Sequence, residues 1–508
     1  RTAGCGAAAP GTRCIGPGGV RDSDAPESQQ RRRLLAGAAG AAAVAVAGSA
    51  SALPRSTVRS WDTTTEVLVV GSGAAGVCAA IAAREAGAQV LMIESQGRPG
   101  GSSGMSPGVI YAGGGTSLQR DLGVEDTVES MYSYLAGAGG QLQPEARLQL
   151  YCEGSPAHFG WLVEQGVPYG GRLSKARGEV PGDASLFYAG DELEWTTRQR
   201  VAPVPRGHVP SAGARPGGQV LMNALLQRAD DLGIVLQVGA SMEQLVVEND
   251  GRVVGAVLAV GAERRTVRTR RGVVIASGGF AHNRDMLRAC APQLHVCAEP
   301  WGSTGTLGGG IAAAVAVGAA TRRMHEGMVV MDIADSDSMA HGLLVNSAGQ
   351  RFVSESSCAA TLGYKVAYQQ DGKAWLICDR EGAAAALARD FQPAAIANSI
   401  GDLAVQLALP PGTLQQSVAY YNRYASGGSD PVFHKLAPWL RPLQGPPYRA
   451  WNLACSEPGC RADTLGGLVT DDTGAVRSAL GEVIPGLYAA GRATSGLPGA
   501  PYAARGLS

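Results

Sequence analysis

The sequence predicts an α/β protein in which helices cover both faces of a largely parallel sheet. Three observations indicate this fold. Residues 66–95 read as an apolar strand, a glycine-rich turn, a helix and a second apolar strand. Two further apolar runs, at 272–276 and 487–490, are each followed by glycine. Strands that are apolar on both faces are typical of sheets covered by helices on both sides.

Length and charge limit the range of functions. The 508 residues suffice for more than one domain. The 43 basic and 43 acidic side chains cancel, so the sequence favours neither nucleic acid nor an anionic membrane surface as a partner. The 72 glycines suit a protein whose backbone approaches a ligand closely at many points.

Residues 1–52 are predicted to be an N-terminal extension that includes an export signal. Residues 1–30 are rich in Gly, Ala and Ser and do not begin with Met, which suggests a fragment or a start upstream of the true one. Arg31 to Arg33, an Ala/Val-rich stretch and Ala50-Ser51-Ala52 resemble a twin-arginine signal. We expect a mature chain from near Leu53, in the periplasm or another extracytoplasmic space, without a stable membrane span. The cytoplasm is the second choice, and a membrane anchor or a disordered basic head is the alternative reading of the segment.

The first strand and turn have the spacing of a dinucleotide-binding unit. After the apolar strand, Gly71 permits a tight turn, Gly73 lets the backbone approach a pyrophosphate, and Gly76 lets helix and strand pack closely. The helix over 74–86 directs its positive end at that phosphate. The second strand ends at Glu94, whose carboxylate can accept hydrogen bonds from a ribose. These features predict a Rossmann-like unit that binds an adenine dinucleotide.

Later glycine clusters favour FAD over NAD. After Glu94 comes a strip of small residues, Gly100 to Gly104, where a nicotinamide enzyme would usually continue into a third strand unit. A strand ending in Ser277-Gly278-Gly279 follows, and a last strand leads to Gly491. Surface turns would explain each cluster singly, but not four sets that each follow an apolar strand. A chain that returns to the nucleotide sheet near its end is typical of the glutathione-reductase-like arrangement.

Several motifs carry a resemblance to a known family. "GSGAAG", "GRPGGSSGMS", "VVIASGGF", "GQRFVSE" and "IPGLYAAGR" resemble the fumarate reductase/succinate dehydrogenase flavoprotein superfamily. Within it, "TSGLPGAPYAARGLS" is most similar to the 3-ketosteroid dehydrogenase branch, particularly the Δ4-(5α) type. The resemblance implies an FAD-binding domain in two parts, 62–285 and 453–508, with an inserted α+β capping domain over 286–452. It also implies that the chain stops where relatives continue into a helix.

The resemblance assigns cofactor contacts by position. The strip after the second strand has no histidine, whereas succinate dehydrogenases attach FAD to a histidine there, so we expect FAD to be held non-covalently. The residues expected to contact it are Gly71, Gly73, Ala75, Gly76, Glu94, Ser95, Gly101, Ser102, Ser103, Gly104, Met105, Met242, Ala276, Ser277, Gly278, Gly491, Arg492, Leu507 and Ser508.

The implied reaction is exchange of a hydride with a CH–CH bond, or an enone C=C, beside a carbonyl of a small ketosteroid-like substrate. Tyr502 matches the family's C-terminal catalytic tyrosine, although a tyrosine packed beside a proline turn is the alternative. The family's second tyrosine falls near Cys358, so Tyr364 is the candidate substitute, and Gly506 could offer an amide to a substrate oxygen. The family's C-terminal serine is Ala504 here.

Two other functions stay open. A dicarboxylate reductase of the fumarate reductase type needs cationic clamps, but "SSCAATLGY" after "RFVSE" has no basic residue, and Arg505 is the remaining candidate. A flavin-binding relative without dehydrogenase activity is the second alternative. The electron donor or acceptor is unknown. The ten cysteines form no Cys-x-x-Cys pair and the histidines lack ligand spacing, so no metal site is expected and disulfide pairing stays open.

Overall fold

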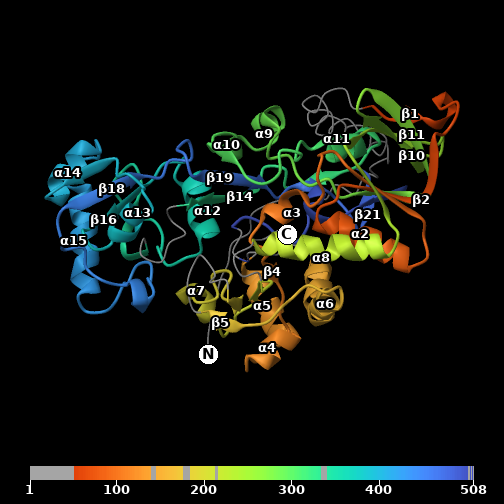
Figure 1. Ribbon diagram of the computed structural model, residues 1–508. Helices are drawn as coiled ribbons and strands as arrows, with labels where there is room; N and C mark the ends of the chain where they lie inside the picture. The colour runs from red at the N-terminus through yellow and green to blue at the C-terminus, as the bar shows by residue number, and fades with distance from the viewer. Residues whose placement is uncertain are drawn as a thin grey trace, which may run out of the picture.

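The computed structural model describes residues 51–138, 145–174, 183–211, 216–332, 340–501, 504 and 506. The predicted signal up to residue 50 therefore lies outside the described residues. A nine-stranded sheet dominates the fold, as the prediction of a mixed α/β protein requires. Figure 1 shows this sheet with β1, β2, β10 and β11 at one end of the molecule.

The core of the sheet is parallel. Strand β11 pairs in parallel with both β2 and β22, and β2 pairs in parallel with β3, which pairs in parallel with β8. The return of the chain to this sheet near its end is thereby confirmed. The strands of this core are β2 (Thr63–Val70), β3 (Val90–Glu94), β8 (Val235–Val238), β11 (Glu263–Ile275) and β22 (Val483–Ala489).

An antiparallel extension continues the sheet beyond β11. The first half of β11 pairs with β10 and its second half with β22, so one long strand joins the two parts. Strand β10 then pairs with β9, and β9 with β1. The extension and the strand that pairs with β22 are β1 (Leu53–Pro54), β9 (Ala240–Val247), β10 (Val253–Val260) and β21 (Ala475–Arg477).

Helices cover both faces of the sheet, which explains the continuous apolar strands. Val69 of β2 packs in a cluster with helices α2 (Ala74–Glu85) and α8 (Gly217–Asp231). Its neighbour Leu68 points into the opposite cluster, with Ile311 of α11 (Gly309–Ala316). Both residues are fully buried. Because successive residues of a strand face opposite sides, burial of both requires cover on both faces.

Four smaller sheets complete the described fold. One, in the order β15-β16-β18-β17, lies with α13, α14 and α15 apart from the large sheet, and α12, β14 and β19 lie between the two (Figure 1). These strands are β4 (Ile110–Tyr111), β5 (Arg172–Ser174), β6 (Ala184–Phe187), β7 (Gly207–His208), β12 (Glu299–Pro300), β13 (Thr321–Arg322), β14 (Gly327–Met331), β15 (Leu343–Val345), β16 (Trp375–Cys378), β17 (Ala395–Ala397), β18 (Tyr448–Asn452), β19 (Cys460–Thr464) and β20 (Gly467–Leu468).

The remaining helices frame these sheets. In the described part of the chain, none is both long and apolar enough to cross a bilayer. The helices are α3 (Gly101–Met105), α4 (Ser117–Asp121), α5 (Val128–Ala138), α6 (Glu145–Glu164), α7 (Trp195–Arg198), α9 (Arg284–Cys290), α10 (Pro292–His295), α12 (Ala359–Gln369), α13 (Ala384–Ala388), α14 (Ile400–Gln406) and α15 (Thr413–Ala425), with the 3₁₀ turn η5 (Gly491–Ala493) after β22.

Candidate active site

The glycine turn has the geometry that its sequence predicts. Gly71 adopts a φ of +106°, in the region that favours glycine, and its amide donates to the Ile93 carbonyl over 2.8 Å. Helix α2 begins directly after Gly73 and ends at Glu85, one residue short of the predicted end. A Cβ at Gly76 would fall on the Gly71 carbonyl, so the close packing of helix on strand requires glycine there.

Glu94 is fixed beside this turn. It is 7% exposed, and one carboxylate oxygen accepts hydrogen bonds from the Ser72 amide at 3.1 Å and the Ser72 hydroxyl at 2.7 Å. The other oxygen accepts from the Gln96 amide at 2.8 Å and the Ser95 hydroxyl at 3.2 Å. The acid therefore lies at the carboxyl end of β3, where the ribose of a dinucleotide is expected.

The strip of small residues lies against the turn as the one-turn helix α3. The Ala74 amide donates to the Ser103 hydroxyl at 3.1 Å, and the Gly100 amide donates to the Ser72 carbonyl at 3.2 Å. Further along, the Ser303 amide donates to the Ser102 hydroxyl at 2.9 Å. Gly104 and Met105 end the helix, and Met105 is 66% exposed. The strip thus extends from the turn toward the segment after β12.

The later glycine clusters arrive at the same edge of the sheet. The Ala276 amide donates to the Val70 carbonyl at 2.8 Å, and the Ala490 amide donates to the Ile275 carbonyl at 3.0 Å. A Cβ at Gly491 would lie 2.6 Å from the Cβ of Ala75. The carboxyl ends of β2, β11 and β22 therefore meet, which brings the turn, the Ala276–Gly278 segment and Gly491 together.

Met242 and Arg492, two further predicted residues, lie on elements that adjoin this edge. Gly239, three residues before Met242, donates from its amide to the Gln96 carbonyl at 3.1 Å, so the start of β9 adjoins the end of β3. Arg492 forms an ion pair with Asp463 of β19. Ser277, between Ala276 and Gly278, has a buried hydroxyl without a protein hydrogen-bond partner in the described residues.

This edge fits an extended cofactor. The strands that end here are buried, yet Gly73, Ala75, Gly101 and Gly278 remain partly exposed. A Cβ at Gly73 would meet only the Ser103 hydroxyl, at 3.5 Å, and one at Gly101 would lie 3.7 Å from the Gly73 Cα. Small residues thus leave the backbone uncovered along the line that a pyrophosphate and flavin would follow.

The predicted catalytic residues are only partly described. Tyr502 lies outside the described residues, as do Leu507, Ser508 and Arg505. Gly506 has a φ of +87°, and its carbonyl accepts from the Tyr111 amide at 3.0 Å. Tyr364 lies on α12, where its ring stacks on that of Tyr368 at 5.0 Å. The catalytic roles of these residues stay predictions.

A buried polar cluster adjoins the C-terminal segment, by which we mean the described residues from Ser495 to Gly506. This cluster was not predicted from the sequence. The hydroxyl of Tyr111 donates to Glu192 at 3.1 Å, and both side chains are fully buried. The Tyr111 ring stacks on that of Tyr134 at 5.8 Å. Arg206, also fully buried, forms a two-pronged ion pair with Asp126 at 2.6 and 2.9 Å. No local pattern links these residues, which lie 80 or so positions apart.

The same region reaches the start of α12. Asp191, next to Glu192, accepts hydrogen bonds from the Cys358 amide and from the Thr361 hydroxyl, both at 2.6 Å. The hydroxyl of Ser356 donates to Glu194 at 2.8 Å. Residues 191–194 therefore connect the position of the family's second tyrosine, near Cys358, with Tyr111 and the C-terminal segment.

Burial raises the pKa of the Glu192 carboxyl to about 7. The folded pKa exceeds the unfolded one, so the folded state binds more protons between about pH 4.5 and 7. We expect the free energy of unfolding to fall across this window by up to about 3 kcal/mol. In Glu192→Gln, denaturant unfolding should lose this dependence, whereas exposed Glu129→Gln should retain it. An unchanged slope in Glu192→Gln would show that this carboxyl does not titrate there.

The comparisons with known proteins agree with this geometry. The model of the FAD binding domain family matches residues 66–504. The 3-oxo-5-alpha-steroid 4-dehydrogenase of Comamonas testosteroni is 29% identical over 85% of this chain and 93% of its own length. A cytochrome-type fumarate reductase of Shewanella frigidimarina is 27% identical over 86% of this chain and 73% of its own.

A solved structure extends the likeness to three dimensions. The 3-ketosteroid-Δ4-(5α)-dehydrogenase of Rhodococcus jostii, in complex with 4-androstene-3,17-dione, superposes with a TM-score of 0.83 at 36% identity. The match covers 89% of this chain and 96% of that structure. The cofactor of this chain is FAD, and the chain is an FAD-dependent oxidoreductase that acts on CH–CH groups. It belongs to the FAD binding domain family, within the fumarate reductase/succinate dehydrogenase flavoprotein superfamily.

Proposed function

We propose that this chain is a ketosteroid dehydrogenase that exchanges a hydride with the carbon–carbon bond beside the ketone of a 3-ketosteroid. The 36% identity to a ketosteroid dehydrogenase that holds 4-androstene-3,17-dione supports this substrate class. The observation that carries the proposal is the charge of the polar groups at the C-terminal segment. They suit a neutral substrate and not a dianion.

Three described cations near this segment are already bound by the protein. Arg206 is paired with Asp126. Arg323 donates to the Ser495 hydroxyl at 3.0 Å and to the Gly496 carbonyl. Arg492 is paired with Asp463. A fumarate site needs cations that face two substrate carboxylates, and breaking these pairs would leave buried charges without partners.

The groups at the start of α12 lead to the same conclusion. Where dicarboxylate-reducing relatives need a cationic residue, this chain has Cys358, which is buried and whose amide donates to Asp191. The Asp191 carboxylate, beside Cys358, would repel a carboxylate of a dianionic substrate. Tyr111, whose hydroxyl donates to Glu192, adds no cation to this region.

FAD, when bound, supplies the hydride acceptor at the sheet edge, under a capping domain over 286–452. The protein's own task is to orient the substrate and move the proton at the neighbouring carbon. We assign the transfer of that proton to the Tyr502 hydroxyl. We assign binding of the ketone oxygen to the Gly506 amide. Tyr111 holds this segment in place, because its backbone amide donates a hydrogen bond to the Gly506 carbonyl. Glu192 in turn accepts a hydrogen bond from the Tyr111 hydroxyl. Non-covalent FAD binding and export remain part of the proposal.

A substrate panel tests the proposal. Under anaerobic conditions, oxidised protein should be bleached by 5α-androstane-3,17-dione at least about tenfold faster than by succinate, because only the neutral ketone suits the paired cations. Absorbance of the flavin measures both rates. Fumarate-dependent reoxidation of reduced protein at millimolar concentration would instead favour the dicarboxylate alternative, and a flavin that responds only to dithionite would favour a relative without dehydrogenase activity.

A further inference from the structure

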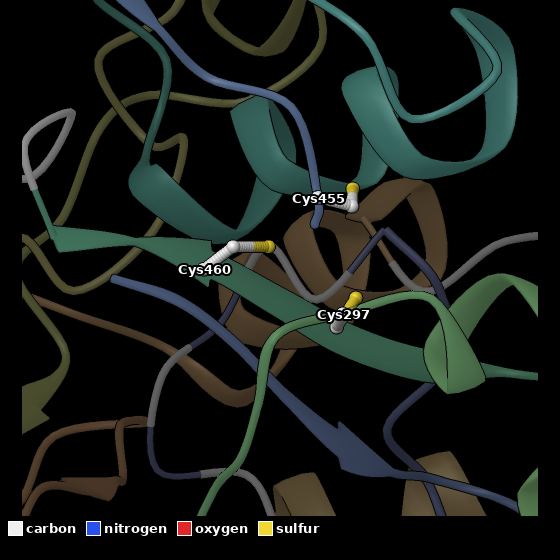
Figure 2. Close-up of side chains that lie close together, drawn as sticks. All are labelled: Cys297, Cys455 and Cys460. Atoms are coloured by element: carbon white, nitrogen blue, oxygen red, sulfur yellow. The ribbon is translucent and has the colours of Figure 1, made fainter. Parts of the chain in front are cut away.

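Three cysteine side chains from separate parts of the chain meet in the interior. The sulfur atoms of Cys297, Cys455 and Cys460 all lie within 4.8 Å of one another, and each residue is 2% exposed. Figure 2 shows the three side chains close together. We refer to these three residues as the cysteine triad. All three are free thiols.

The triad joins the two connections between the large sheet and the sheet formed by β15 to β18. Cys297 follows α10 on the outgoing connection, and Cys455 and Cys460 lie on the returning one. The Ala298 amide donates to the Cys455 carbonyl at 2.9 Å. Strand β19, which begins at Cys460, pairs with both β12 and β14. An ion bound by all three sulfurs would therefore crosslink the two connections.

The donor set is purely sulfur. Within the described part of the chain, no histidine, aspartate or glutamate joins the group, and the surrounding residues belong to the main apolar cluster. Thiolates select soft ions such as Cu(I) or Zn(II). Structural zinc is almost always four-coordinate, and among the described residues no fourth His, Cys, Asp or Glu joins the three sulfurs. Three sulfurs without a fourth ligand suit three-coordinate Cu(I).

The dimensions also suit one central ion. Three sulfurs in a plane around an ion at about 2.3 Å would lie about 4 Å apart, a little below the observed limit of 4.8 Å. A disulfide needs a sulfur–sulfur separation of about 2.05 Å and would involve only two of the three sulfurs.

We propose that the cysteine triad is a binding site for one Cu(I) ion. Three S–H bonds are replaced by three S–Cu bonds, three protons pass to solvent, and copper stays monovalent, so no oxidant or reductant is consumed. The positive charge of Arg284, which acts on Cys297, offsets part of the negative charge left on the sulfurs. The proposal does not depend on which substrate the enzyme uses.

The test is anaerobic titration of the FAD-containing protein with Cu(I) in competition with bicinchoninate. The wild type should take up one more Cu(I) per chain than Cys297→Ala, Cys455→Ala or Cys460→Ala. Cys290→Ala is the matched control, because Cys290 is half-buried on α9 outside the triad, and it should bind as the wild type does. Cu(I) should also raise the unfolding midpoint of the wild type and the control only.

Two outcomes would overturn the proposal. One is equal Cu(I) uptake by the wild type and the triad variants, with flavin content confirming that the variants are folded. The other is a disulfide between two triad residues, found by mass spectrometry of unreduced protein. X-ray absorption of the Cu(I)-loaded wild type needs no variant: three sulfur neighbours at about 2.3 Å support the site, and fewer sulfurs, or nitrogen and oxygen neighbours, contradict it.

Discussion

Gly76→Val should give protein without bound flavin. A Cβ at residue 76 would fall on the Gly71 carbonyl, so α2 must move away from β2, and the amides at its start leave the pyrophosphate position. We expect the affinity for FAD to fall by at least about a hundredfold, or about 2.7 kcal/mol. Flavin absorbance of the purified variant and titration of the apoprotein with FAD measure this loss.

Gly87→Ala is the matched control for this prediction. Gly87 follows the other end of the same helix with a φ of +82°, but a Cβ there would meet nothing within 4 Å. The variant carries backbone strain of about 1 kcal/mol without displacing the turn, and it should purify yellow. Normal FAD binding by Gly76→Val would mean that the turn does not hold the pyrophosphate.

Tyr502→Phe should retain FAD and lose most of its activity. If the Tyr502 hydroxyl moves the proton at the carbon beside the hydride position, its removal should slow substrate-dependent bleaching by about 10²-fold or more. Loss of one hydroxyl leaves the turn, Glu94 and the strip unchanged, so the yellow cofactor should remain. Stopped-flow absorbance under single-turnover conditions measures the chemical step separately from product release.

Tyr420→Phe is the control for this variant. Tyr420 is 45% exposed on α15, a helix that lies apart from the large sheet (Figure 1). It should bleach at the wild-type rate. Tyr364→Phe tests the second predicted tyrosine in the same assay. A Tyr502→Phe protein that bleaches at the wild-type rate would reassign Tyr502 to packing and remove it from the mechanism.

Sequence patterns predicted the parts of the site that depend on local spacing. Gly71, Gly73 and Gly76 stand at offsets that one turn and one helix require, so the chain around them needs no distant partner to be recognised. Glu94 follows from the same unit, because the second strand must lie beside the first. The return of β22 could be predicted because an apolar strand followed by glycine has few other places in a covered parallel sheet.

Contacts between distant segments could not be predicted in this way. Tyr111 and Glu192 are 81 positions apart, and neither stands in a periodic pattern that marks it as a partner of the other. Cys297 meets Cys455 only because β12 and β19 pair, which is a property of the complete fold. The spacing of Cys455 and Cys460 alone is typical of neither a metal site nor a disulfide.

We expect this chain to remove hydrogen from a CH–CH bond beside a ketone, using FAD held along the edge of the sheet. The most direct measurement is anaerobic single turnover with 5α-androstane-3,17-dione, followed by analysis of the steroid. We predict that one 4-androstene-3,17-dione forms for each FAD reduced. Unchanged steroid and oxidised flavin, in protein whose FAD dithionite still reduces, would contradict it.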